Sequence, residues 1–145
     1  MAEILLIEDN PGDVLLTIEA FKECGNKHNI VSVKDGVEAI KYLKHEVNYK
    51  DAVLPELILL DLNLPKKDGR EVLEEIKCDE MLKNIPVIIL STSKNESDIS
   101  RCYELNSNCY ISKPVELDSF IDIIKSIEKY WLQTSKLPKT IKQLI

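Results

Sequence analysis

Five short apolar runs divide the chain at regular intervals, and the segments between them carry the three- and four-residue spacing of amphipathic helices. The runs at 4–7, 57–60 and 87–90 are continuously apolar, which is typical of strands buried on both faces of a sheet. Such strands occur in parallel sheets that helices cover on both sides. The five predicted strands are residues 4–7, 30–33, 57–60, 87–90 and 109–111.

Capping signals independently mark the starts of four of the intervening helices. In each, an Asn or Asp that can accept bonds from the free N–H groups of a first turn precedes an acid by three residues. The pairs are Asn10 with Asp13, Asp35 with Glu38, Asp68 with Glu71, and Asn95 with Asp98. We expect an α/β fold: a flavodoxin-like, doubly wound three-layer sandwich whose five-stranded parallel sheet has the order 2-1-3-4-5.

The length of 145 residues suits one domain with one core. We assign residues 1–132 to this domain. Residues 133–145 follow the last predicted helix as a C-terminal tail, which is a candidate docking or dimerisation extension.

The charge balance bears on partners. A formal net charge of −6 with 30% charged residues indicates an acidic, soluble protein that does not itself bind nucleic acid or an anionic membrane. No apolar run reaches the length of a membrane span and no signal-peptide pattern is present, so we expect a cytoplasmic protein. The four cysteines lack metal-binding or disulfide spacing, and we expect His28 and His45 at the surface without a chemical role.

The polar residues at the strand ends form the candidate site. Glu8 and Asp9 follow the first predicted strand, and Asp61 follows the third. Ser91 follows the fourth, and Lys113 lies just after the fifth. In an open α/β sheet, ligands bind outside the carboxyl ends of the strands, near the switch point of the strand order. These side chains are therefore predicted to meet at one rim.

Three carboxylates at one rim point to a cation. Two of them about 4 Å apart repel by roughly 4 kcal/mol at an effective dielectric near 20. Oxygen ligands from few protein groups suit Mg²⁺, which keeps several waters. A carboxylate can also act as a nucleophile and form an aspartyl phosphate, with a cation and Lys113 neutralising the charge.

The conjunction of these residues resembles the response-regulator receiver domain of two-component signalling. The resemblance covers about residues 3–131, and the flanking segments 5–10, 59–65 and 110–114 agree with it. It implies that Asp61 is the phosphoacceptor and that Lys113 is the phosphate partner. The residues that carry it are Glu8-Asp9, Asp61, Ser91 and Lys113-Pro114.

The resemblance also implies the metal ligands. Asp9 and Asp61 would bind Mg²⁺ directly, joined by the backbone carbonyl of Asn63. Glu8 stands where a second acid helps to hold the ion, often through water. Many relatives have Asp at this position, where this chain has Glu.

A two-state switch is the mechanism that the resemblance implies. Ser91 occupies the position of the switch hydroxyl and Tyr110 that of the switch aromatic, so phosphorylation would reshape the surface of the fourth helix, fifth strand and fifth helix. Asn63 and Ser93 occupy positions that tune the hydrolysis of the phosphoryl group. The Lys113-Pro114 bond is often cis in this family.

Partners follow from the same resemblance. It implies a sensor histidine kinase as the phosphoryl donor, and the segments 10–13, 64–71 and 130–138 further resemble short single-domain regulators paired with phytochrome-type histidine kinases. Regulators of that kind tend to dimerise, so a homodimer is a further hypothesis. The downstream target is not indicated.

Other functions compete with this reading. A receiver-like scaffold that binds proteins without phosphorylation usually lacks an acid or the lysine, whereas this chain has the full set. A flavin carrier on the same fold needs a phosphate-cradling loop after the first strand, where Glu8 and Asp9 would repel phosphate. A phosphatase with an aspartyl nucleophile needs an Asp two residues further on as acid–base, and Asn63 stands there instead. We therefore expect a phosphoacceptor that assists its own phosphorylation and dephosphorylation, and not an enzyme.

Overall fold

The computed structural model describes residues 2–138 and contains one sheet with helices on both of its faces. The strands are β1 (Glu3–Ile7), β2 (Asn29–Val33), β3 (Leu57–Leu60), β4 (Val87–Ser91) and β5 (Cys109–Ser112). The α-helices are α1 (Pro11–Glu23), α2 (Gly36–Leu43), α3 (Gly69–Cys78), α4 (Glu96–Glu104) and α5 (Leu117–Ile127). A short 3₁₀ turn (Val47–Tyr49) precedes β3, and a π-helical turn (Glu128–Thr134) follows α5.

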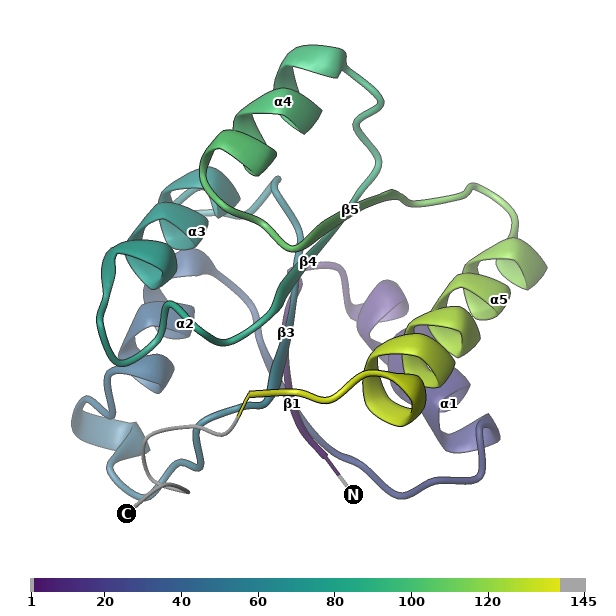
Figure 1. Ribbon diagram of the computed structural model, residues 1–145, viewed down its shortest axis with the longest axis horizontal. Helices are drawn as coiled ribbons and strands as arrows, with labels where there is room; N and C mark the ends of the chain where they lie inside the picture. The colour runs from purple at the N-terminus through teal and green to yellow at the C-terminus, as the bar shows by residue number, and fades with distance from the viewer. Residues whose placement is uncertain (1, 139–145) are drawn as a thin grey trace.

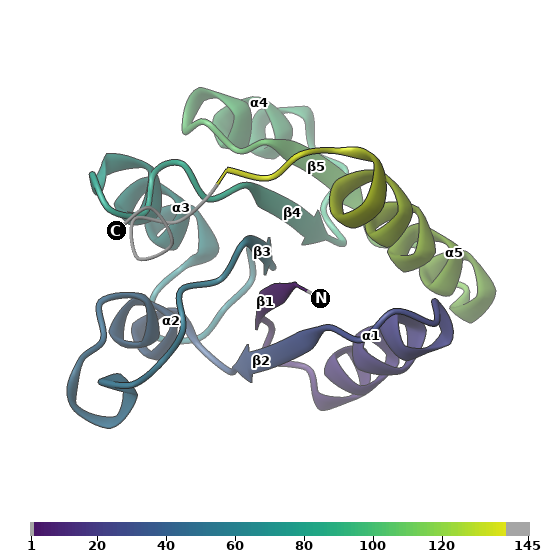
Figure 2. The same ribbon diagram turned by 60° about the horizontal axis from the view of Figure 1, so that its bottom comes forward.

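All four strand pairings are parallel, and the strand order is β2-β1-β3-β4-β5. The expected flavodoxin-like order 2-1-3-4-5 is thus confirmed. Helices α1 and α5 lie on one side of the sheet, while α2, α3 and α4 lie on the other (Figures 1 and 2). The arrangement is a three-layer sandwich in which the order reverses between β1 and β3.

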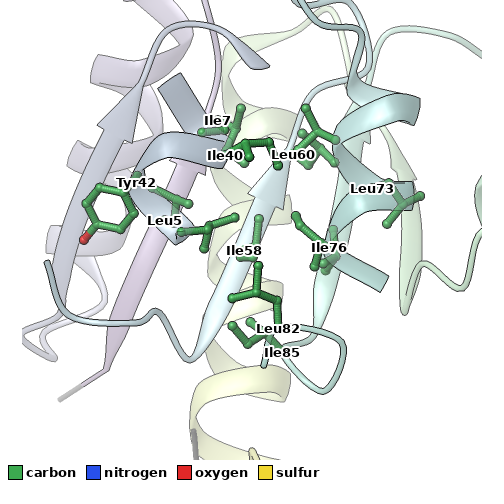
Figure 3. Close-up of a cluster of buried hydrophobic side chains, with 14 of the residues drawn as sticks. Leu5, Ile7, Ile40, Tyr42, Ile58, Leu60, Leu73, Ile76, Leu82 and Ile85 are labelled. Carbon is green, nitrogen blue, oxygen red and sulfur yellow. The ribbon is translucent and has the colours of Figure 1, made fainter. Parts of the chain in front are cut away.

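Two apolar cores hold the layers together. Alternate residues of each central strand point to opposite faces, so Leu5 and Ile58 contact the α2–α3 side, as Figure 3 shows together with Ile76. Leu6 and Leu59 belong to the second core, which α1 and α5 cover. Burial on both faces explains why these strands are continuously apolar.

The four predicted helix starts are confirmed as side-chain caps. Asn10 accepts from the N–H groups of Gly12 and Asp13, and Asp35 accepts from that of Glu38. Asp68 and Asn95 likewise cap α3 and α4. Each cap satisfies N–H groups that have no partner inside the helix, which fixes the point where the chain leaves the rim of the sheet.

The register of the strands aligns their carboxyl ends. Ile7 lies opposite Leu60 in the β1–β3 pair, and Ser91 lies opposite Ser112 in the β4–β5 pair. The N–H of Asp61 donates to the carbonyl of Ile7 at 3.0 Å, which extends the ladder one residue beyond β3. The residues after β1, β3 and β5 therefore reach the same edge of the sheet.

The helical path after α5 continues to Thr134, and the side chains of Trp131 and Leu132 pack against the second core. The hydroxyl of Ser135 donates to the carbonyl of Trp131 at 2.6 Å. Residues 139–145 of the predicted tail lie outside the described residues.

The expectation that His28 is a surface residue is wrong. Its side chain is 6% exposed and its Nε2 lies 3.2 Å from Oε1 of Glu128, while its Nδ1 accepts from the N–H of Ala2. Asn26 and Gln133 also donate to the buried Glu128 carboxylate. His28 and Glu128 are 100 residues apart in the chain, so no local sequence pattern could reveal their contact.

Candidate functional site

An acidic cluster lies at the carboxyl ends of β1 and β3. Glu8, Asp9 and Asp61 each offer a carboxylate oxygen, and these oxygens lie within 4.8 Å of one another. Glu8 is 4% exposed and Asp61 8%, whereas Asp9 faces solvent. The convergence predicted from the strand ends is present in the structure.

The ammonium of Lys113 lies against this cluster from the end of β5. Its Nζ donates to Oε2 of Glu8 at 2.7 Å, to Oδ2 of Asp13 at 3.0 Å and to Oδ2 of Asp61 at 3.4 Å. The Lys113 side chain is 6% exposed, so these charges interact through little water. One buried cation is shared among three carboxylates.

Asp13 belongs to the site although the sequence indicated only a role at a helix start. It lies in the first turn of α1, which begins directly after the rim residues of β1. A first-turn acid on a helix that leaves the rim is a signal that could have identified it.

Burial and neighbouring charges change the ionisation of Glu8 and Lys113. Burial raises the pKa of Glu8 from 4.5 to about 7, and the negative charge of Asp61 adds to this against the lowering effect of Lys113. For Lys113, burial lowers the pKa, but the hydrogen bond to Glu8 and the charge of Asp61 outweigh burial and raise it above its usual value. Both groups thus retain a proton more strongly, Glu8 mainly because it is buried and Lys113 because acids surround it.

This donor set fits a divalent cation. Four carboxylates, those of Glu8, Asp9, Asp13 and Asp61, face one ammonium, so the cluster carries uncompensated negative charge. Hard carboxylate oxygens of this kind are the ligands that Mg²⁺ prefers. The N–H of Asn63 donates to Oδ1 of Asp61 at 3.3 Å, which places the backbone of Asn63 beside the cluster.

Gly69 permits the close approach that shapes this rim. A Cβ on Gly69 would lie 2.4 Å from the backbone carbonyl oxygen of Asp61 and 2.6 Å from Cα of Leu62. Real Cβ atoms do not approach backbone so closely, so only glycine allows the start of α3 to pack on the residues after β3. The position of the loop that carries Asn63 depends on this contact.

Ser91 and Tyr110 lie at the rim but do not join the acidic cluster. Oγ of the fully buried Ser91 accepts from the N–H of Ser93 at 3.2 Å. The hydroxyl of the half-buried Tyr110 donates to the carbonyl of Ser93 at 2.8 Å. Among the described residues, no hydrogen bond connects either side chain to Asp61. The Lys113-Pro114 peptide is trans.

A flavodoxin-like sheet that carries a carboxylate cluster and a buried lysine at the carboxyl ends of β1, β3 and β5 defines the receiver domains of two-component signalling. The family model described as the response regulator receiver domain matches residues 4–125, and the chain belongs to that family. Proteins of this family are signalling proteins and not enzymes.

Relatives of known name agree with this assignment. Response regulator Rcp1 of Synechocystis is 46% identical over 135 residues, covering 93% of this chain and 92% of the relative. The structure of the phosphorylated cyanobacterial phytochrome response regulator RcpA superposes with a TM-score of 0.91 at 52% identity, covering 95% of this chain and 99% of that one. The Mn²⁺-bound form of Rcp1 gives a TM-score of 0.92 at 45% identity, covering 96% and 100%.

The metal seen in the Rcp1 structure and the donor set of this chain lead to the same conclusion. A divalent cation, Mg²⁺, is the cofactor that the Glu8–Asp9–Asp61 cluster fits. Among residues 2–138, no helix is long and apolar enough to cross a membrane.

Proposed function

We propose that Asp61 accepts a phosphoryl group from a sensor histidine kinase and that the aspartyl phosphate switches the α4–β5–α5 surface. The observation that carries the proposal is the position of the Asp61 carboxylate, which lies within the acidic cluster and 3.4 Å from Nζ of Lys113. A carboxylate nucleophile needs no general base, because it has no proton to lose.

The transfer step follows from this geometry. A carboxylate oxygen of Asp61 forms a bond to phosphorus as the P–N bond to the kinase histidine breaks, and the histidine nitrogen keeps the bonding electron pair. Mg²⁺ would neutralise charge on the phosphoryl oxygens, held by Asp9, Asp61 and the backbone carbonyl of Asn63 with the help of Glu8. Lys113 moves its ammonium from the carboxylates to a phosphoryl oxygen.

Ser91 and Tyr110 transmit the change in this proposal. The new phosphoryl oxygens offer strong acceptors to the Ser91 hydroxyl, which then leaves the N–H of Ser93. Movement of this loop frees space for the Tyr110 ring to turn inward. The equilibrium between the two arrangements is thereby shifted, and the α4–β5–α5 surface changes shape.

The relatives suggest a phytochrome-like kinase as the partner. Rcp1 and RcpA, the latter described as a phytochrome response regulator, support this choice. A probable methanogenesis regulatory protein, FilR2 of Methanothrix harundinacea, is also 40% identical over 136 residues, covering 93% of this chain and 86% of the relative. Phosphotransfer from a phytochrome kinase and from a control kinase of another class would decide between these partners.

A homodimer formed through α5 and the tail is part of the proposal. Leu117 is 52% exposed and Tyr130 59% exposed on the outer side of this region. We also propose residues 133–145 as the extension that docks or dimerises. A molar mass by light scattering that stays monomeric at all concentrations would exclude the homodimer.

Intact mass after incubation with acetyl phosphate tests the central proposal. We expect one phosphoryl adduct that requires Mg²⁺, is absent from Asp61→Asn and persists in Asp122→Asn, a matched change at an exposed acid of α5. If a folded wild-type protein forms no adduct and binds no Mg²⁺, the phosphorylation-independent scaffold becomes the better account.

A further inference from the structure

Ser93 makes four hydrogen bonds, and two of them are to the proposed switch residues. Its N–H donates to Oγ of Ser91 at 3.2 Å, and its carbonyl accepts from the hydroxyl of Tyr110 at 2.8 Å. Its own hydroxyl donates to Oδ2 of Asp98 at 2.7 Å, and the hydroxyl oxygen accepts from the N–H of Asn95 at 3.3 Å. The first two bonds must break if Ser91 and Tyr110 change position, whereas the third is independent of both.

The third bond leads to an ion pair between two helices. Asp98, in the first turn of α4, accepts from Nη2 of Arg70 at 2.6 Å. Arg70, in the first turn of α3, also donates through Nη1 to Asp68, the cap of that helix, at 3.1 Å. The hydrogen bonds from Ser93 and Arg70 together hold the pKa of Asp98 below its usual range. Helices α3 and α4 lie on the same side of the sheet (Figure 2).

We infer that Arg70 and Asp98 are positioning residues that hold Ser93, and through it Ser91 and Tyr110, in the unphosphorylated arrangement. This inference rests on the proposed function. The latch, defined as Arg70, Asp98 and the Ser93 hydroxyl, ties the loop after β4 to the helix that follows the Asp61 loop. A charged acceptor makes the Ser93 hydroxyl bond stronger than a neutral one would.

The latch affects the equilibrium between the inactive and active arrangements of the protein. When Ser91 moves towards a phosphoryl group on Asp61, either the backbone of Ser93 moves with it or the bond between the Ser93 N–H and Ser91 Oγ breaks. The bond from the Ser93 hydroxyl to Asp98 resists movement of the Ser93 backbone. Removing the latch lowers the free energy of the active arrangement relative to the inactive one, so more of the unphosphorylated protein populates it. A charge-assisted bond of this exposure corresponds to roughly three- to tenfold in that ratio.

The test compares phosphorylation rates with acetyl phosphate in Asp98→Asn, Arg70→Gln and the wild type. We expect both variants to react roughly three- to tenfold faster. The matched control is Glu75→Gln, which breaks the Lys67–Glu75 pair of 2.8 Å at α3 without touching Ser93. The control should react at the wild-type rate.

A second readout separates positioning from loss of stability. In the unphosphorylated variants, the amide NMR signals of Ser91, Ser93 and Tyr110 should move along the line joining the free wild type and its beryllofluoride complex. The double variant Ser93→Ala with Asp98→Asn should react no faster than Asp98→Asn alone, because both changes act on the same bond between Ser93 and Asp98.

The outcomes distinguish the two proposals. If the wild type itself forms no adduct, the proposed function fails and the latch fails with it. If the wild type is phosphorylated but both variants react at the wild-type rate with unmoved amide signals, only the latch is overturned. Equal acceleration in Glu75→Gln would also overturn it, since the effect would then belong to any ion pair of α3.

Discussion

Replacement of Lys113 by Met tests whether this ammonium holds the site together. The side chain is almost fully buried and donates to Glu8, Asp13 and Asp61. Methionine fills a similar volume without charge, so the change removes the cation and leaves the three carboxylates facing one another. The protein without Mg²⁺ should therefore lose stability.

The expected loss can be estimated from the burial of the pair. Removing one partner of a buried ion pair costs about 3–5 kcal/mol, because the remaining charge is left uncompensated. For a domain of this size, about 3 kcal/mol corresponds to a fall in Tm of roughly 10 °C. Saturating Mg²⁺ supplies positive charge at the same place, so the loss should shrink by about 1 kcal/mol or more.

Urea unfolding in EDTA and in excess Mg²⁺ measures both quantities. The matched control is Lys125→Met, since Lys125 makes only an exposed 3.5 Å pair with Glu23 and should cost less than about 0.5 kcal/mol. If Lys113→Met costs less than about 1 kcal/mol in EDTA, or if Mg²⁺ does not reduce its cost, the electrostatic account of the cluster is wrong.

Three further results are expected. Because the pKa of Glu8 is raised from 4.5 to about 7, the metal-free protein should lose up to about 3 kcal/mol of stability as the pH rises from about 4.5 through 7. Mg²⁺ should therefore stabilise the protein more at pH 8 than at pH 6. Urea unfolding with and without Mg²⁺ at both pH values measures this, and equal stabilisation by Mg²⁺ at the two pH values would contradict it. Gly69→Ala should destabilise the fold by about 1–3 kcal/mol, since the added Cβ would lie 2.4 Å from the carbonyl oxygen of Asp61. A Mg²⁺ titration should also show weaker binding, and an unchanged affinity would show that the position of the loop after β3 does not affect metal binding. Glu128→Ala should cost about 2–4 kcal/mol in thermal unfolding, because His28, Asn26 and Gln133 lose a buried acceptor; a loss under 0.5 kcal/mol would refute that role.

The strand order and the rim could be predicted because their signals are local. Continuous apolar runs and helix caps mark where each strand ends, and in a parallel sheet these ends share one edge. The placement of Glu8, Asp61 and Lys113 followed directly from this rule. The contact of Lys113 with Asp13 did not, because it depends on which turn of α1 faces the rim.

The parts that could not be predicted depend on contacts between distant segments. His28 was expected at the surface because nothing near it in the sequence reveals Glu128. The Arg70–Asp98 pair joins two helix starts that the sequence marks only as capped ends. This pairing between side chains 28 residues apart depends on how α3 packs beside α4. The spacing of apolar residues in the sequence does not indicate that packing.

Locating the phosphoryl group on the chain tests the central claim most directly. After reaction with acetyl phosphate and Mg²⁺, borohydride reduction converts an aspartyl phosphate to homoserine, which peptide mass spectrometry assigns to one position. The account predicts homoserine at residue 61 alone, and only when Mg²⁺ was present. Homoserine in place of Asp9 or Asp13, or modification at residue 61 that is independent of Mg²⁺, would contradict it.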